Sequence, residues 1–262
     1  MFATSLANGM RLLASFTMEH PALSNRELAE RSGLSKASVS RLTNTLCELG
    51  FLRFDPQARS YRLGSVTLAV GYPLLGGLWI RHIARPFMQA LADEVRGSVS
   101  IALRDRFNMV YVETCRGHEA LAFRPDIGGA MPLWCPPPGR PWLAGVAPAL
   151  RNDAVKRLRL AHAGEWRKHG QATRESLDGF GQRGFCLSRG DWQRDVHAVG
   201  VPMRALIDGE TLVFNCGVPA TRLRPGELES AIGPRLLRLV REVEQAWATH
   251  RADIAAPAEP SP

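Results

Sequence analysis

The sequence predicts an α+β protein, with a small helical part followed by a larger mixed part. Three observations support this prediction. Apolar residues recur at helical spacing in short segments near the N-terminus, two short alternating segments follow, and the remainder mixes helical with strand-like segments. Helix, strands, helix, strands, helix is the order typical of an α+β sensor domain. A chain of 262 residues is long enough to hold two modest domains.

The charge of the chain makes nucleic acid a candidate partner. The formal net charge is +8, and of the 33 basic residues only Lys36, Lys156 and Lys168 are lysine. The planar guanidinium group of arginine suits phosphate. A basic composition alone does not establish such a partner, because arginine-rich usage can also be a genomic habit.

The cysteines and histidines predict no metal or other cofactor. The five cysteines are scattered and form no CxxC pair, and the seven histidines include no HxxxH spacing. The N-terminal residues lack the apolar core of a signal peptide, and no run approaches the roughly eighteen apolar residues that would span a bilayer. We therefore expect a cytoplasmic protein with reduced cysteines and no membrane partner.

The first expected helix is amphipathic. Leu6, Met10 and Leu13 repeat at helical spacing and predict a helix over about residues 3–17. A His-Pro pair then ends it, because proline cannot continue a helix.

Two further helices are marked by the signals at their ends. Ser24 followed by Glu27 is a capping box, in which the serine side chain accepts from a free backbone N–H of the helix and the glutamate side chain accepts from the backbone N–H of the serine. The short helix that it opens stops at Gly33, because glycine adopts the left-handed turn conformation. Ser35 caps the next helix, expected over residues 36–49. Two short helices joined by a glycine turn form a helix-turn-helix.

The second helix of this motif has a narrow apolar stripe and a polar face. At about 100° per residue, the polar side chains lie opposite the stripe. A helix-turn-helix places the N-terminal half of this helix in the DNA major groove. The stripe consists of Val39, Leu42, Leu46 and Leu49. The opposite, mainly polar face consists of Ala37, Ser40, Arg41, Asn44 and Glu48.

A basic hairpin follows. Two short alternating segments separated by the turn-forming cluster DPQAR predict a hairpin over residues 51–63. A helix-turn-helix with such a hairpin is a winged helix, and the hairpin arginines are placed to meet sugar-phosphate. The residues expected to bind DNA are Ser24, Ser35, Lys36, Ala37, Ser38, Ser40, Arg41, Asn44, Arg53, Arg59 and Arg62. The alternative is a winged helix that serves as a protein-interaction module.

The segment LSNRELAERSGLSKASVSRLTNTLCELGFLRFDPQARSYRLG resembles the DNA-binding domain of the IclR family of bacterial transcription regulators. Ala37 departs from the family pattern, which more often has serine or threonine there, so one hydroxyl contact is lost. The resemblance implies a regulator that binds a roughly palindromic double-stranded operator as a homodimer or homotetramer. It also implies control of a catabolic operon.

The rest of the chain predicts a linker and a second domain. Residues 64–77, GSVTLAVGYPLLGG, predict a linker helix that bends or stops near its tyrosine–proline pair. A helix over about residues 78–96 follows, and a terminal helix runs to Trp247 with an interruption at a Gly-Pro pair. Between them we expect strands at SVSIALRD, MVYVETC and LAFR, a helix at residues 147–160, and strands at RGFCLSR, AVGVPMRAL and TLVFNCGV.

The second domain is similar to the GAF-like effector-binding module of the same family, on the segments ARPFMQALADE, MVYVETCRG and GFCLSRGDW…VHAVGVPM. The resemblance implies a pocket for a small organic effector, often a carboxylate. The resulting division is residues 1–64 for the winged helix-turn-helix domain, 65–77 for the linker helix, 78–252 for the effector-binding domain and 253–262 for a disordered tail.

The stretch PLWCPPPGRPWLAG, residues 132–145, aligns with the effector loop of the family. Backbone N–H groups at positions 135 to 138 commonly face the ligand in that family, but Pro136, Pro137 and Pro138 have none. The resemblance therefore implies that a carboxylate cradle cannot form here and that small carboxylates are not sensed as they are by better-known relatives. The implied effector-binding residues are Trp134, Cys135, Gly139, Arg140, Arg189, Asp191, Ala198, Phe214 and Cys216.

The implied pocket is aromatic. Trp134, Trp142 and Phe214 would leave it few hydrogen-bonding groups, which suits larger and flatter ligands. Our hypothesis is an aromatic or hydrophobic effector, whose acid group is met by Arg140 or Arg189. The alternatives are a small polar acid and a pocket that is closed or reassigned.

Other classes of function have little support in the sequence. Cys115 with His118 is the only close pair that suggests nucleophilic catalysis, and no third orienting residue is evident, so we expect no enzymatic activity. Cys135 beside Trp134 is typical of a packed, inert thiol. A ligand-independent or redox-sensing DNA-binding regulator is the alternative function.

Overall fold

The computed structural model describes residues 2–117 and 126–255. The chain divides into two compact units, the first ending at Gly77 and the second beginning at Leu78. Each has its own sheet, and each is described by itself. The expected strand LAFR and His118 lie outside the described residues.

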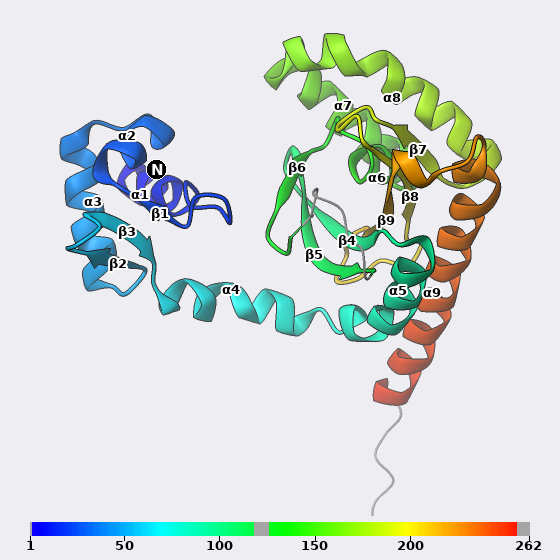
Figure 1. Cartoon of the computed structure of the whole chain (residues 1–262), viewed down its shortest axis with the longest axis horizontal. Helices are drawn as coiled ribbons and strands as arrows, with labels where there is room; N and C mark the ends of the chain where they lie inside the picture. Colours follow the sequence, from blue (N-terminus) through cyan, green and yellow to red (C-terminus); the bar gives the residue numbers. More distant parts are fainter. Residues whose placement is uncertain (1, 118–125, 256–262) are drawn as a thin grey trace, which may run out of the picture. The chain divides into compact units, whose positions relative to one another are not determined.

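The first unit is a helical domain with a small antiparallel sheet (Figure 1). Its sheet has the strand order β1-β3-β2, so a two-residue strand that the sequence did not predict completes the hairpin. The elements are α1 (Thr4–Leu13), β1 (Ala22–Leu23), α2 (Asn25–Ser32), α3 (Lys36–Glu48), β2 (Leu52–Asp55), β3 (Ser60–Leu63) and α4 (Ser65–Gly77).

The ends of the helix-turn-helix are as predicted. The hydroxyl of Ser24 accepts from the N–H of Glu27 at 3.3 Å, and the Glu27 carboxylate accepts from the N–H of Ser24 at 2.8 Å. The Ser24 hydroxyl also donates to the Glu27 carboxylate at 2.7 Å, and this bond, together with the one from the Ser24 N–H, lowers the pKa of the Glu27 carboxyl. Gly33 ends α2 with a φ of +68°, and Ser35 accepts from the N–H of Ser38 at 3.2 Å.

The predicted apolar face of α1 was wrong at two of its three positions, since Leu13 is half-buried against the core. Leu6 and Met10 are 66% and 57% exposed, whereas Leu12 and Phe16 are buried. The helix ends at Leu13, earlier than expected, and the turn after it carries Phe16 into the core. A helix this short takes its buried face from the elements that it packs on, here α2 and α3, rather than from its own spacing.

The stripe of α3 also differs at its last position. Leu49 lies just after α3 and is 58% exposed, whereas Thr43 within α3 is fully buried. Thr43 tolerates burial because its hydroxyl donates to the carbonyl of Val39 at 2.9 Å.

The linker helix α4 runs through Pro73, so of the two expected outcomes, a bend or a stop, the stop does not occur. None of its side chains is buried, and none carries a charge. Its first turn is joined to the winged helix, since the hydroxyl of Thr67 donates to the carbonyl of Phe51 at 3.1 Å.

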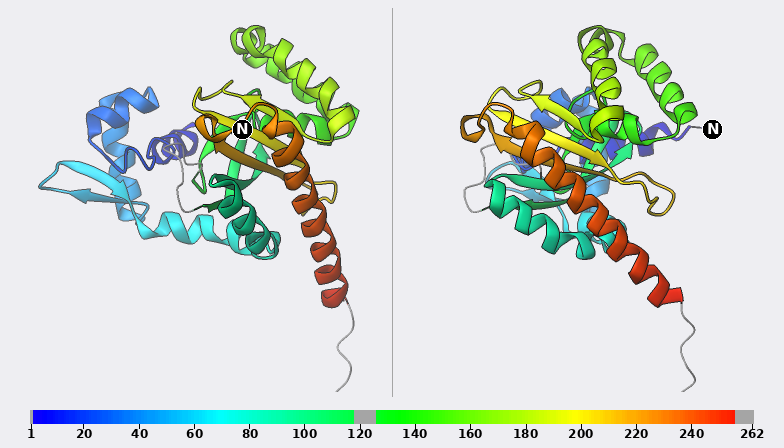
Figure 2. Two further views of the ribbon diagram at one scale, coloured as in Figure 1. Left: turned by 45° about the vertical axis from the view of Figure 1, so that its right-hand side comes forward. Right: turned by 90° about the vertical axis from the view of Figure 1, so that its right-hand side faces the viewer.

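The second unit is built on one six-stranded antiparallel sheet with the order β6-β5-β4-β9-β8-β7 (Figures 1 and 2). Helices α5 and α9 pack on each other and on one face of the sheet, and α6, α7 and α8 lie toward the other face. The elements are α5 (Ile80–Val95), β4 (Ser98–Asp105), β5 (Asn108–Arg116), β6 (Ala130–Pro132), α6 (Gly139–Gly145), α7 (Pro148–Ala161), α8 (Ala163–Arg183), β7 (Cys186–Arg189), β8 (Val196–Pro202), β9 (Val213–Pro219), a 3-10 turn (Ala220–Arg222), a π-helical turn (Leu228–Ile232) and α9 (Gly233–Ala255).

Most expected elements of this unit are present, with three differences. Helices α6 and α8 were not predicted, and α9 continues through residues 253–255, which were assigned to the tail. The expected interruption at the Gly-Pro pair is the point where the π-helical turn gives way to α9. Residues 256–262 lie outside the described part of the chain.

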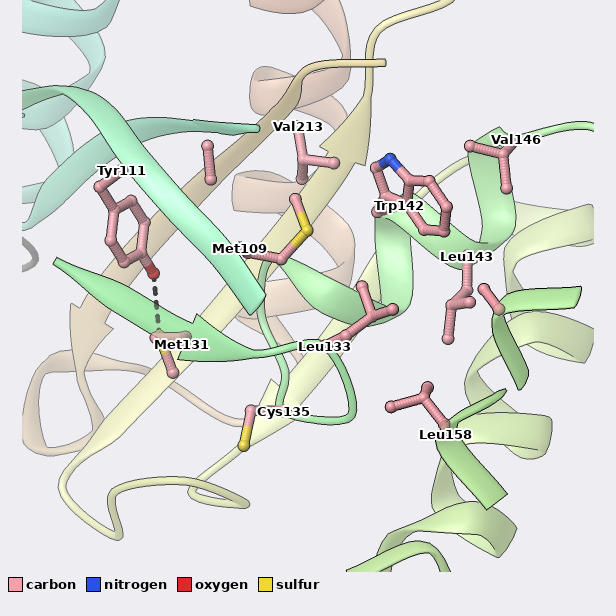
Figure 3. Packing of buried hydrophobic residues seen from close by; sticks show 12 residues of the cluster. Met109, Tyr111, Met131, Leu133, Cys135, Trp142, Leu143, Val146, Leu158 and Val213 are labelled. Carbon is pink, nitrogen blue, oxygen red and sulfur yellow. Dashed lines mark hydrogen bonds between the residues drawn. The ribbon is translucent and has the colours of Figure 1, made fainter. Parts of the chain in front are cut away.

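A buried cluster fills the space between the sheet and helices α6 and α7 (Figure 3). The hydroxyl of Tyr111 donates to the sulfur of Met131 at 3.0 Å within it, and Trp142 enters it from α6. On the opposite face, the carboxylate of Glu113 is 4% exposed and accepts from Arg81 at 3.0 Å and from Arg85 at 2.9 Å, which joins α5 to β5.

Candidate functional site

The exposed face of α3 carries the side chains expected to read DNA. Lys36, Ala37, Ser40, Arg41 and Asn44 are all exposed and lie on one side of the helix. No carboxylate of the described chain forms an ion pair with Lys36 or Arg41, so both cations are available to phosphate or to base edges.

Internal hydrogen bonds hold several polar groups of this face. The Asn25 amide donates to the Ser40 hydroxyl at 3.0 Å, and the Asn44 amide donates to Glu48 at 3.1 Å. Ser24 and Ser35 act as helix caps, so their hydroxyl groups orient α2 and α3. Asn25 was missed by the sequence analysis, although an amide at the first position of α2 is itself a signal for a polar contact near a helix N-terminus.

The wing adds a second basic surface. Arg53 and Arg62 lie directly opposite each other across β2 and β3, and both are exposed. Arg59 stands in the turn between the strands with a φ of +49° and is also exposed. Like charges opposite each other in a sheet are destabilising, and a phosphate bound between them removes that cost.

The second unit contains a small cavity on the face of the sheet that the 132–145 loop covers; we call this the loop face. Its volume is about 20 Å³, close to that of one water molecule. Its floor is polar, and its walls are mostly apolar. The lining residues are Ser98, Pro137, Ser188, Trp192, Gln193, Val196, Ala198, Asn215 and Gly217.

Strand register determines which residues reach the cavity. Ser98 and Ala198 both pair with Gly217, and directly paired residues face the same side of a sheet, here the loop face. Asn215, two residues from Gly217 along β9, faces that side too. Phe214 and Cys216 alternate with them and are fully buried on the face under α5 and α9, so the structure does not bring them to the cavity. A shift of one residue in alignment moves every side chain to the other face.

The floor has an unsatisfied polar atom. Asn215 is 2% exposed, and its Oδ1 atom has no hydrogen-bond partner within the described chain. Ser98 on the neighbouring strand β4 and Ser188 on β7, beyond β8, also line the cavity and are 6% and 3% exposed. A buried carbonyl oxygen without a partner is costly, and a bound donor group would relieve that cost.

The tryptophans of the loop lie away from the cavity. Trp134 packs on His162 with ring centroids 4.8 Å apart, and Trp142 belongs to the buried cluster of Figure 3. Trp192, which was not predicted, lines the cavity instead and is 48% exposed.

The loop itself bonds internally. The N–H of Cys135 donates to the carbonyl of Pro132 at 2.9 Å, and the N–H of Gly139 donates to Cys135 at 3.2 Å. An added Cβ at Gly139 would lie 1.9 Å from the carbonyl oxygen of Leu133, so glycine is required there. Of this segment, Pro137 lines the cavity.

The two arginines expected to meet an acid group are both ion-paired. Arg140 has a side chain that is only 4% exposed, and it donates to Asp191 at 2.7 Å. Arg189 points from the other face of β7 and pairs with Glu229. Of these two arginines, Arg140 is therefore the one that lies on the loop face, beside the segment that carries Trp192.

The cysteines have the character of packed thiols. Burial raises the pKa of Cys135 and of Cys216 to about 12 and that of Cys186 to about 11. Burial also raises the pKa of Cys47 and Cys115. A raised thiol pKa disfavours the reactive thiolate. No helix among the described residues is long and apolar enough to cross a membrane.

A winged helix with a basic face, on the same chain as an α+β domain with an internal cavity, defines a two-domain transcriptional regulator. Residues 5–56 match the IclR helix-turn-helix domain, and residues 74–245 match the bacterial transcriptional regulator IclR C-terminal domain. The chain belongs to the IclR family of DNA-binding transcriptional regulators, whose members are not enzymes.

Individual relatives agree with this assignment. The HTH-type transcriptional regulator TsaQ1/TsaQ2 of Comamonas testosteroni is 31% identical over 242 residues, covering 92% of this chain and 87% of the relative. The crystal structure of an IclR family transcriptional regulator from Brucella abortus is 39% identical with a TM-score of 0.80, covering 94% of this chain and 92% of that one. An IclR homolog complexed with 4-hydroxybenzoate from Microbacterium hydrocarbonoxydans has the same fold, with a TM-score of 0.72 at 19% identity over 94% of this chain and 99% of that one.

Proposed function

We propose that this regulator controls a catabolic operon in the cytoplasm and responds to a small aromatic or hydrophobic molecule bound in the loop-face cavity. The observation that supports the proposal is the unpartnered, buried Oδ1 atom of Asn215 at the floor of that cavity. Apolar walls with a few polar groups are typical of sites for small organic ligands.

The lining selects for a flat molecule with a hydrogen-bonding substituent. Trp192 and Pro137 present apolar surface, and Ser98, Ser188 and Asn215 present groups that fix orientation. A relative of the same fold binds 4-hydroxybenzoate, a ring with such a substituent. The cavity holds about 20 Å³, so the segment that carries Trp192 has to move to admit a ring.

The acid group of an aromatic acid would be met by Arg140. That arginine is charged, buried and bound to the carboxylate of Asp191. A ligand carboxylate can accept from the guanidinium group as Asp191 does, and the Nε atom of Arg140 is without a partner in the described chain. Arg189 is less suited, since it lies on the opposite face of β7 with Glu229.

Calorimetric titration of the full chain tests the effector. We expect hydroxybenzoates or related aromatic acids to bind and glyoxylate-like acids to bind weakly. The variant Asn215→Leu should weaken binding by about tenfold or more, because it removes a buried hydrogen-bond group. The matched control is Asn152→Leu, the same change at an exposed site on α7. Tight binding of small keto acids alone would contradict the aromatic proposal.

We further propose that the regulator binds its operator as a homodimer or homotetramer. The support is α4, which is apolar along its length and has no buried side chain in the single chain. A helix that is apolar all round is normally covered. The repressor or activator sense of regulation is separate from this proposal.

A further inference from the structure

The second unit has a second cleft, which shares no lining residue with the loop-face cavity. Its volume is about 350 Å³. It lies where β4 ends, where β4 turns into β5, and where α7 passes them. The lining residues are Arg104, Arg106, Phe107, Arg157 and Glu210.

Three arginines line this cleft, and three carboxylates, those of Asp105, Asp153 and Glu210, stand near them. Arg106 pairs with Asp105 at 3.3 Å and Arg157 with Asp153 at 3.0 Å, and both arginine side chains are more than half exposed. Ion pairs of this exposed kind contribute little and exchange readily with other anions.

Arg104 is different, because no carboxylate in the described part of the chain forms an ion pair with it. Its Nε atom donates to the carbonyl oxygen of Arg106 at 2.7 Å, and its guanidinium carbon lies 4.4 Å from the centre of the Trp142 ring. Burial is the largest cause of the lowered pKa of Arg104 and the neighbouring charge of Arg157 adds to it, while Glu210, Asp153 and Asp105 act in the opposite direction. Arg104 therefore has neighbouring carboxylates but forms no ion pair within the described part of the chain.

The chemistry of this cleft matches a small dianion. Guanidinium groups bind phosphate and carboxylate through paired N–H donors. The cleft volume is at the lower end of the range for small-molecule sites. Phe107 supplies an apolar wall, and the carboxylate of Glu210, which also lines the cleft, opposes anion binding, so the arginines must outweigh it.

We propose that the cleft formed by Arg104, Arg106 and Arg157 is a second ligand site of this protein, for a small molecule that carries a phosphate or two carboxylates. The site is in contact with the effector loop, since Arg104 lies over Trp142 of α6, and α6 follows Pro137 directly along the chain. Occupation of the cleft fixes Arg104 and so bears on the position of α6.

The test uses the full chain without DNA, with inorganic phosphate, succinate and acetate as probes at constant ionic strength. Binding is measured by titration calorimetry and by the rise in Tm. We expect phosphate or succinate to bind and acetate not to bind. Comparing the affinity and the rise in Tm for phosphate with those for succinate identifies which dianion the site prefers.

Two variants locate the site. Arg106→Ala/Arg157→Ala keeps the half-buried Arg104 and should weaken dianion binding at least about tenfold. Arg167→Ala/Arg174→Ala changes the net charge equally at exposed positions of α8 and should leave binding unchanged. Absence of dianion binding to the parent chain overturns the proposal. Equal loss in both variants, or phosphate binding that survives in the cleft variant and so belongs to the winged helix, also overturns it.

Discussion

Arg140 is the most deeply buried charged residue on the loop face, and a single carboxylate, that of Asp191, compensates its charge. Its side chain is 4% exposed, its Nε atom has no partner within the described chain, and Asp191 is its ion-pair partner at 2.7 Å. A buried charge that loses its partner is strongly destabilising. The ion pair therefore fixes the segment that carries Trp192 onto α6.

Replacing Asp191 with asparagine tests this. We expect Asp191→Asn to lower the free energy of unfolding by about 2 kcal/mol, less than for a fully buried pair because Asp191 is 34% exposed. The control Asp195→Asn, at an exposed site of the same segment, should change it by less than about 0.5 kcal/mol. Denaturant unfolding followed by circular dichroism measures both, and equal effects would contradict the assignment.

Arg41 lies on the exposed face of α3, where we expect it to contact a base edge. Arg41→Ala should weaken operator binding by about 1 to 3 kcal/mol. Arg174→Ala, an exposed arginine of α8, is the control and should leave the affinity unchanged. Fluorescence anisotropy with an operator fragment measures the difference. Unchanged affinity of Arg41→Ala removes this residue from the recognition set.

Two glycines of the first unit give opposite expectations. Gly33 has a φ of +68° and open space around it, so Gly33→Ala should destabilise the domain by about 1 kcal/mol through backbone strain alone. Gly9 lies inside α1, also with open space, and Gly9→Ala should stabilise by about 0.5 to 1 kcal/mol. Thermal unfolding distinguishes them, and a shared sign would contradict the argument.

At the scale of the element, the wing makes a separate prediction. Each phosphate contact contributes about 0.9 to the slope of log affinity against log salt concentration. Arg53→Ala/Arg62→Ala should therefore flatten the slope while changing sequence preference little, because these arginines face sugar-phosphate. Binding at several salt concentrations measures the slope, with Arg174→Ala as control. An unchanged slope would place the wing away from DNA.

Elements with local signals were predictable from the sequence, and those that depend on packing were not. The capping box at Ser24 and the glycine turn were confirmed, because each is set by neighbours along the chain; the strand over residues 98–105 was also confirmed, although it pairs with the distant β9. The buried face of α1 was not predicted correctly, because it is determined by packing on α2 and α3. Helix α8 was missed, since its sequence is polar with scattered glycines and lacks a strong apolar stripe.

The cavity could be predicted only in part, for a reason of register. The 132–145 loop and Ala198 were identified from the sequence, and both reach the cavity. Asn215 was missed in favour of its neighbours Phe214 and Cys216, because an alignment uncertain by one residue cannot assign faces. The alternation of Asn215 with two apolar neighbours was the available signal, because a polar side chain in a buried strand indicates a position that faces a cavity.

At the scale of the whole molecule, α4 controls assembly in our proposal. Val70 and Leu74 are one turn apart and 64% and 60% exposed. We expect Val70→Glu/Leu74→Glu to reduce the oligomeric mass in sedimentation experiments and to weaken operator binding, since charge on that face opposes its burial. The control Leu150→Glu/Leu160→Glu changes exposed leucines of α7 and should leave the mass unchanged. Parental mass in both variants would contradict the role of α4.

The three consecutive prolines of the effector loop have a consequence for how this protein changes over time. A ligand held by backbone amides is recognised by groups that substitution leaves in place. Here the loop offers no such groups at three positions, so in our proposal recognition rests with the side chains of Ser98, Ser188, Asn215 and Trp192. Single codon changes reach those side chains, and ligand preference can drift while the winged helix keeps its operator. The same property makes the cavity a practical starting point for building sensors of new compounds.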